Sequence, residues 1–282
     1  MTEKNYKPFL YFNGDSFTEG AGLCDDEIFK EYPGHFKDNK TAVESNWVWT
    51  RDKILRAKGY DFHMSLINAN KTKAYPAVIG KMANIDVYNN AVGGSNIFGI
   101  LVRTVSDLTK FAIEGRIPEQ VFIGLTGIDR LPIVNIELSF VHSGENREWI
   151  HTVMPKFIDM VDPKYKKYAE EYWKSHHDSQ ILTTYLYHCH SIKTIVKNIT
   201  GKDPIFLRTS YYWENNKDIV SNSKLPVLQD IWEILNFSQI DNQESLVNIA
   251  WHDGITACGH FVPAGHIKYA DYVFKNFIQK SS

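Results

Sequence analysis

Gly14, Asp15 and Ser16 stand directly after an apolar run, residues 9–12, that predicts a buried strand. In an open parallel sheet, ligands bind outside the carboxyl ends of the strands, so a serine at this place is positioned to act as a nucleophile. Gly14 permits close approach of another backbone segment, and Asp15 suits the cap of the turn that follows. The same three residues are equally compatible with an ordinary strand-to-helix turn in which Ser16 has no chemical role.

Two histidines, His260 and His266, lie near the end of the chain with Pro263 between them. Proline is favoured at the first position of a helix, which places His260 in the preceding loop and His266 on the first turns of the helix. A serine hydroxyl is a weak nucleophile at neutral pH and needs an adjacent base. We therefore expect His260 to be that base for Ser16, and His266 to be mainly structural.

Other kinds of site have weaker support. His188 and His190 suggest a metal site, but residues two apart on a predicted helix point in different directions. The sequence contains no H-E-x-x-H, no P-loop, no G-x-G-x-x-G and no G-x-S-x-G motif. Cys24, Cys189 and Cys258 lie far apart and form no C-x-x-C, which favours reduced thiols over a disulfide or a structural zinc. We expect neither a metal nor a cofactor.

The composition is that of an ordinary globular protein, with 43% hydrophobic and 23% charged residues among 282. The net charge of -2 argues against duplex nucleic acid or an anionic membrane surface as a partner. No signal-peptide core is present, and no apolar stretch approaches the ~18 residues that a membrane-spanning helix needs. These features predict a cytoplasmic or virion-associated protein, and they leave the oligomeric state open.

Short apolar runs alternate with longer amphipathic segments, a pattern typical of an α/β fold. Strands are predicted at residues 9–12, 85–88, 121–125 and 205–208, with a weaker fifth at 246–249. Helical periodicity covers residues 74–83, 97–114, 178–199, 225–236 and 264–279. Residues 24–70 and 131–177 fit this alternation poorly, and we interpret them as insertions into a single domain that spans residues 1–282.

Four segments, in order along the chain, resemble the conserved blocks of the SGNH (GDSL-type) hydrolases. Residues 14–16 look like block I, residues 89–96 like block II with its Gly94, and residues 260–266 like the C-terminal block. Residues 75–82 resemble the helix that commonly precedes block II. The resemblance implies a three-layer α/β/α sandwich, flavodoxin-like, with a mainly parallel sheet of about five strands. It also implies hydrolysis of a small-molecule or carbohydrate ester through an acyl-enzyme, with Ser16 as nucleophile and His260 as base, and no cofactor.

The oxyanion hole of this family uses backbone N–H groups, here those of Ser16 and Gly94, together with an asparagine in block III. That block reads G-x-N-D in the family, and aligning Asp129 with its aspartate puts Ile128 where the asparagine belongs. An isoleucine side chain donates no hydrogen bond, so we expect Thr126 or Arg130 to take its place. The alternative is that the block has decayed.

The family's third catalytic residue is an aspartate three positions before the histidine, and that position is Ala257. The nearest acidic residue is Asp253, seven positions before His260, and it could orient the imidazole if the loop is longer. Otherwise a Ser–His dyad remains, with a backbone carbonyl holding the ring. Asp253 and Gly254 are also compatible with a plain turn.

These departures support a function of another class. The fold could persist as a structural or carbohydrate-binding protein with weakened catalysis, for example in a virus particle of the bacteriophage type. The missing asparagine and the displaced aspartate favour this alternative. The retained Ser16, Gly94 and His260 favour an ester hydrolase, which is the prediction that we adopt.

Overall fold

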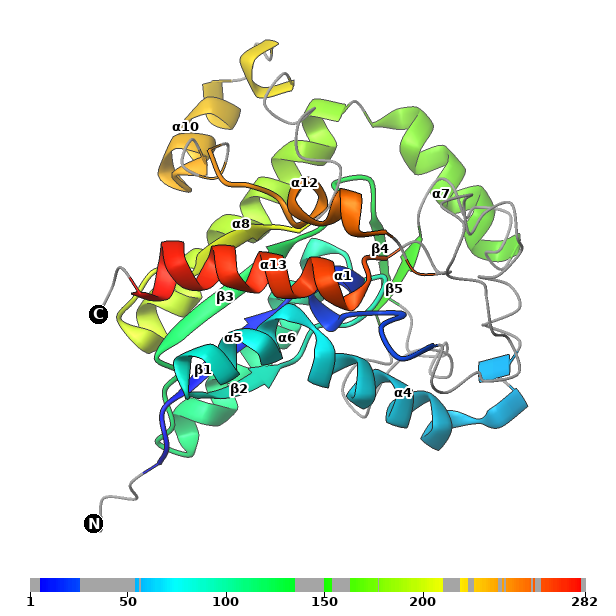
Figure 1. Cartoon of the computed structure of the whole chain (residues 1–282). Coiled ribbons are helices and arrows are strands. Elements are labelled where there is room, and N and C mark those ends of the chain that lie inside the picture. Colours follow the sequence, from blue (N-terminus) through cyan, green and yellow to red (C-terminus); the bar gives the residue numbers. More distant parts are fainter. Residues whose placement is uncertain are drawn as a thin grey trace.

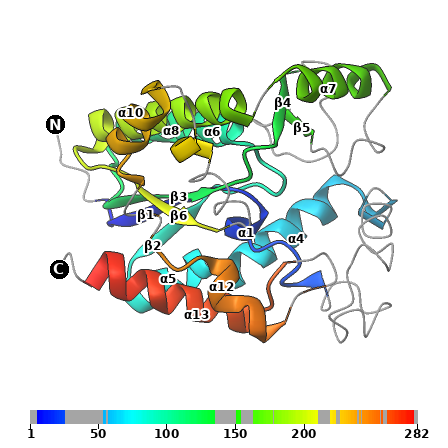
Figure 2. The same ribbon diagram turned by 90° about the horizontal axis from the view of Figure 1, so that it is seen from above.

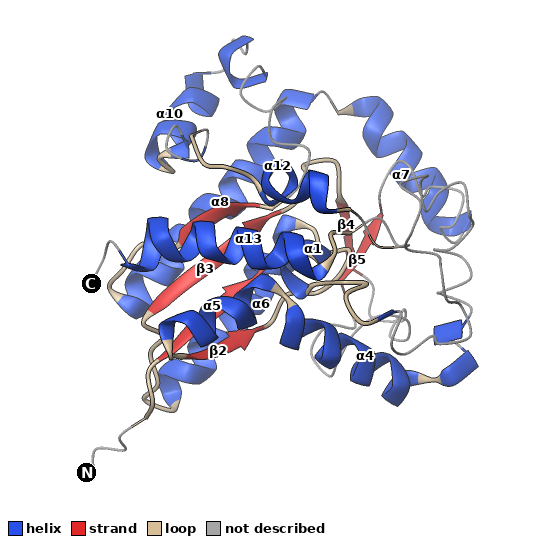
Figure 3. Ribbon diagram, viewed as in Figure 1, coloured by secondary structure: helices blue, strands red, loops and turns tan. Residues whose placement is uncertain are grey.

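A computed structural model describes residues 6–25, 54–55, 57–134, 150–153, 163–176, 178–209, 219–222, 226–237, 240, 242–254, 256 and 260–279. Four of the strands in these ranges form one parallel sheet in the order β2-β1-β3-β6. Figure 3 draws the strands in red. Their bounds are β1 (Phe9–Asn13), β2 (Asp86–Asn89), β3 (Gln120–Leu125) and β6 (Ile205–Arg208). All four lie at, or within one residue of, the runs that the sequence predicts.

Helices cover both faces of this sheet. The central strands are buried almost throughout, as expected for near-continuous apolar runs in a parallel sheet. Side chains on one face, such as Tyr11 and Ile123, pack against α6 (Ile97–Ile113), α8 (Asp178–Thr200) and α10 (Pro226–Ile234). Their neighbours on the other face, such as Phe12 and Phe122, pack against α5 (Tyr75–Ala83), α12 (Leu246–Ala250) and α13 (Pro263–Val273). The chain is therefore a three-layer α/β/α structure, as predicted (Figure 2).

The predicted fifth strand is wrong, because residues 246–249 lie in helix α12. A short apolar run is compatible with either element, and here Ser245 decides, since its side chain accepts a hydrogen bond from the N–H of Asn248 and caps a helix. The open edge of β6 is covered by Gln243 instead, whose side-chain amide donates to the carbonyl oxygen of Phe206 at 3.1 Å. Within the described residues, β6 is thus an edge strand of the sheet.

The two predicted insertions are described in part. In the first, residues 26–53 lie outside the described residues, and helix α4 (Tyr60–Lys73) occupies the end. In the second, β4 (Leu131–Val134) and β5 (Ile150–Val153) pair antiparallel, and helix α7 (Pro163–Ser175) follows (Figure 1). Across the described ranges, every helix is too short or too polar to cross a membrane.

Candidate active site

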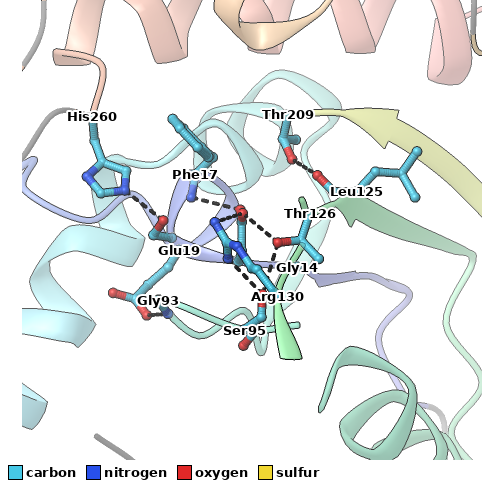
Figure 4. A network of polar contacts seen from close by, with 12 residues as sticks. Gly14, Phe17, Glu19, Gly93, Ser95, Leu125, Thr126, Arg130, Thr209 and His260 are labelled. Carbon is cyan, nitrogen blue, oxygen red and sulfur yellow. Dashed lines mark hydrogen bonds and ion pairs between the residues drawn. The ribbon is translucent and has the colours of Figure 1, made fainter. Parts of the chain in front are cut away.

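Ser16 and His260, 244 residues apart in sequence, meet at the carboxyl end of β1. The Nε2 atom of His260 lies 2.6 Å from the Ser16 hydroxyl oxygen (Figure 4). Ser16 opens the short helix α1 (Ser16–Glu19), which Asp15 caps by accepting a hydrogen bond from the N–H of Phe17 at 3.1 Å. The contact between serine and histidine that the sequence led us to expect is therefore present.

The turn that carries Ser16 is tightly packed, and Gly14 makes this possible. A Cβ atom on Gly14 would overlap the side chain of Thr18 and would lie 3.3 Å from the Cα of Gly124 in β3. The hydroxyl of Thr18 in turn lies 3.2 Å from that of Tyr75. Gly14 thus allows the close approach of neighbouring backbone that we inferred from its type.

His260 is held by contacts with Thr256 and Phe17. The N–H of Thr256 donates to the carbonyl oxygen of His260 at 2.5 Å, and the N–H of His260 donates to the Thr256 hydroxyl at 3.2 Å. The ring of Phe17 packs on the imidazole, with ring centroids 5.0 Å apart. Since Phe17 follows Ser16 directly, Ser16 and His260 are packed as one unit.

Asp253 pairs with a lysine. Its Oδ1 atom accepts a hydrogen bond from the ammonium of Lys268 on α13 at 2.5 Å. Asp253 itself ends a 3₁₀-helical turn, Trp251–Asp253, that follows α12. Ala257, where the family has its aspartate, lies outside the described residues.

Two backbone N–H groups, those of Ser16 and Gly94, donate to no acceptor among the described residues. Gly94 has a φ of +77°, and a Cβ atom there would meet nothing within 4 Å, so this residue faces open space. The preceding N–H, that of Gly93, donates to the carboxylate of Glu19 at 2.6 Å. A Cβ atom on Gly93 would lie 3.6 Å from the Cβ of Ser16, which places this segment directly beside Ser16.

Thr126 and Arg130 both contact Ser95, as Figure 4 shows, and both also contact Asp15. The Arg130 guanidinium lies 3.1 Å from an Asp15 carboxylate oxygen and donates to the carbonyl oxygen of Ser95 at 2.7 Å. The Thr126 hydroxyl lies 3.1 Å from the same carboxylate oxygen and 2.9 Å from the same carbonyl oxygen. Ile128, which the sequence comparison aligned with the block III asparagine, packs against the hydrophobic cluster of α6 and α8.

The charges of this network are buried. The Arg130 side chain is 7% exposed and that of Asp15 is fully buried. Burial raises the pKa of Asp15, and the neighbouring Arg130 guanidinium opposes that rise. A second cation, Arg103 of α6, donates to the Ser95 hydroxyl at 2.7 Å. Two arginines therefore hold the residue that follows Gly94.

His266 lies apart from this network, in the packing between α5 and α13. It is fully buried, its Nδ1 atom accepts a hydrogen bond from the N–H of Tyr75 at 3.2 Å, and its ring stacks on that of Tyr75. Burial lowers the pKa of His266 to about 3, so the ring is neutral at physiological pH. These contacts agree with the structural role expected for it.

Sequence reasoning missed Glu19, Ser95 and Arg103. Glu19 carried one usable signal, since it is the one acidic residue among the apolar and small residues of 17–24, and a charged side chain is rarely buried without a partner. The partner of Glu19 lies 74 residues away, however, and no local pattern points to it. Throughout the ranges that the structure describes, no three His, Cys, Asp or Glu side chains gather as a metal site would require.

No protein-family model matches the chain, and no curated protein matches it. Among solved structures, it is similar to a protein of Desulfitobacterium hafniense DCB-2 assigned to the G-D-S-L family of lipolytic proteins. That similarity has 14% identity and a TM-score of 0.40, over 95% of this chain and 98% of the other. A carbohydrate esterase, whose active site displays divergent catalytic and non-catalytic binding functions, matches at 13% identity and a TM-score of 0.48, over 100% of this chain and 68% of the other. With both TM-scores below 0.5, these similarities assign no activity and no site residue.

Proposed function

We propose that this protein is a serine ester hydrolase of the SGNH type, with Ser16 as nucleophile and His260 as general base. The observation that carries the proposal is the 2.6 Å contact between the Ser16 hydroxyl and His260 Nε2 at the carboxyl end of a parallel strand. A base within hydrogen-bond reach is what a serine needs in order to become a nucleophile at neutral pH. The motif resemblance supports the same assignment.

The reaction would proceed in two halves. Ser16 Oγ attacks the ester carbonyl carbon while its proton moves to His260 Nε2, and the carbonyl oxygen becomes an oxyanion. The N–H groups of Ser16 and Gly94 are available to stabilise that charge. Collapse expels the alcohol, which takes the proton from His260, and leaves an acyl group on Ser16. Water, deprotonated by His260, then releases the acid and restores the serine.

We propose that a backbone carbonyl orients His260, which makes the pair a dyad. The pairing of Asp253 with Lys268 supports this choice over a triad that uses Asp253. Phe17 packs on the imidazole, and two hydrogen bonds with Thr256 hold the backbone of His260. We take the substrate to be a small-molecule or carbohydrate ester, as the SGNH resemblance implies.

The test is ester turnover with p-nitrophenyl acetate, combined with labelling of the serine by a fluorophosphonate. Ser16→Ala and His260→Gln should each lower kcat by at least about 10³-fold, because serine and histidine act as one catalytic unit. Ser65→Ala is the matched control, since Ser65 lies on α4 and, among the described residues, donates only to the carbonyl oxygen of Phe62. A folded wild-type protein that neither turns over acetyl or longer-chain esters nor is labelled at Ser16 would refute the proposal. That result would favour the structural or carbohydrate-binding alternative.

A further inference from the structure

Two connections join the segment that carries Ser16 to the segment that carries Gly94. Asp15 and Glu19 belong to the segment of the nucleophile, and Gly93 and Ser95 flank the second N–H donor. One connection is direct, because the carboxylate of Glu19 accepts the N–H of Gly93. The other runs from Asp15 through Arg130 to the carbonyl oxygen of Ser95. Gly94 is therefore fixed from both sides to the segment that carries Ser16.

The direct connection is short and shielded from water. Glu19 Oε2 lies 2.6 Å from the nitrogen of Gly93, and Glu19 is 4% exposed. A hydrogen bond in a place shielded from water is electrostatically stronger than the same bond in water. Because this bond occupies the N–H of Gly93, the N–H of Gly94 is the one of the two that can donate to a ligand.

The second connection is an ion pair inside the protein. Asp15 and Arg130 are both buried, and Arg130 uses separate nitrogens for Asp15 and for the Ser95 carbonyl oxygen. A planar guanidinium suits such a two-sided bridge, which the single nitrogen of a lysine cannot reproduce. Thr126 spans the same two groups with its hydroxyl.

An oxyanion hole needs donors that are in place before the charge develops. Here the two candidate donors come from backbone segments 78 residues apart, and Ile128 supplies no side-chain donor to join them. The distance between the two N–H groups therefore depends on what holds the two segments together. We propose that Arg130 and Glu19 are positioning residues, which keep the N–H groups of Ser16 and Gly94 in place to donate to the same oxyanion. This inference rests on the proposed ester hydrolase function.

The experiment compares kcat, KM and the inhibition constant of an alkylboronic acid in purified variants. Boron accepts the Ser16 oxygen and becomes a tetrahedral anion, so its binding reports the oxyanion hole, whereas KM reports largely ground-state binding. Arg130→Met and Glu19→Met remove the two connections. Glu19→Gln is the conservative counterpart, because its amide oxygen still accepts the Gly93 N–H. Arg116→Met is the control for loss of an arginine, since Arg116 stacks on Phe9 and Phe111 and pairs with Glu114, none of which belongs to the site.

Arg130→Met and Glu19→Met should each lower kcat about 100-fold, the loss expected for donors displaced by ~1 Å, with KM changed less than about threefold. Boronate inhibition should weaken by a similar factor. The kcat of Glu19→Gln should be at least about tenfold higher than that of Glu19→Met, because the amide oxygen restores an acceptor for the Gly93 N–H. Arg116→Met should match the wild type.

Arg130→Met leaves the Asp15 carboxylate without its buried cation, which can prevent folding. Thr126→Val keeps the shape of the side chain and removes only the hydroxyl, so it serves as the second variant. We expect it to lower kcat and boronate affinity together, by about tenfold. Equal decreases in the kcat and in the boronate affinity of Thr126→Val would support the inference even if Arg130→Met does not fold.

Two results would overturn the inference. One is an unchanged kcat in folded Glu19→Met and Thr126→Val. The other is a lower kcat with an unchanged boronate inhibition constant, which indicates a smaller fraction of active protein rather than a displaced donor. In both cases the wild type still hydrolyses esters through Ser16, so the proposed function stands. An inactive wild type that Ser16 reagents do not label would instead refute the proposed function itself.

Discussion

Replacing His266 with asparagine should change how the stability of this protein depends on pH. His266 is fully buried between α5 and α13, and its ring stacks on Tyr75 with centroids 6.1 Å apart. Its Nδ1 atom accepts the N–H of Tyr75, and burial lowers the pKa of His266 to about 3. A neutral imidazole is therefore part of the folded structure.

The magnitude follows from the difference in pKa between the two states. A histidine in the unfolded chain has a pKa of about 6.5, so below that pH the unfolded chain binds a proton that folded His266 does not. Above pH 6.5 the titration of His266 does not lower the free energy of unfolding. Below that pH the free energy of unfolding decreases, and the decrease grows as the pH falls towards 3. Between pH 7 and pH 5 it lowers the free energy of unfolding by about 2 kcal/mol.

The assay is urea unfolding of wild type and His266→Asn at pH 7 and pH 5, followed by tryptophan fluorescence. The asparagine oxygen can still accept the N–H of Tyr75, but the lost ring should destabilise the variant by about 1–3 kcal/mol at pH 7. At pH 5 its deficit relative to the wild type should be smaller by about 2 kcal/mol, because the variant has no group to protonate there. His252→Asn is the control, since His252 is an exposed histidine.

If wild type and His266→Asn lose the same free energy of unfolding between pH 7 and pH 5, His266 is not the group that causes the loss. Ester turnover at pH 7 provides an independent check on the assignment of the base. Folded His266→Asn should keep most of its turnover, whereas His260→Gln should lose it. Equal losses in the two variants would identify His266 as part of the chemistry.

Two further predictions concern Asp253 and Gly124. Asp253→Asn breaks a pair with Lys268, which is more than half exposed, so it should cost less than about 1 kcal/mol of stability and change turnover less than about threefold. A loss of turnover near 10⁴-fold in a folded Asp253→Asn protein would show instead that this carboxylate orients the histidine. Gly124→Ala places a Cβ atom against the side chain of Thr18 and should lower the free energy of unfolding by about 1–3 kcal/mol. Adding Thr18→Ala should restore part of that loss in urea unfolding, and an additive loss in the double variant would contradict the overlap.

Secondary structure could be predicted from the sequence where the residue pattern was compatible with one type of element. Residues 9–12, 121–125 and 205–208 are short apolar runs between longer helical patterns, and each forms a strand of the parallel sheet. Residues 246–249 are as apolar, yet they form a helix, because a run of four residues is too short for periodicity to separate the two elements. The capping serine at position 245 was the missing signal.

Ser16 and His260 could be selected from the sequence because each stands at a position defined by its own element. One follows a predicted strand, and the other precedes a helix that begins at Pro263. The contact between them is found in the structure, while their catalytic roles remain part of the proposal. The expectation that Thr126 or Arg130 occupies the place of the missing asparagine likewise stays a prediction, now beside their observed bonds to Asp15 and Ser95.

The sequence by itself determined the strand-helix alternation, the strand end that carries Ser16 and the loop that carries His260, because these depend on neighbours a few residues apart. Only the tertiary structure decided which partners the polar side chains take. Glu19 meets Gly93, and Asp15 meets Arg130, across distances in sequence that no local pattern encodes. Packing also set the charge state of His266, since the cost of protonating an imidazole depends on how completely the surrounding layers exclude water.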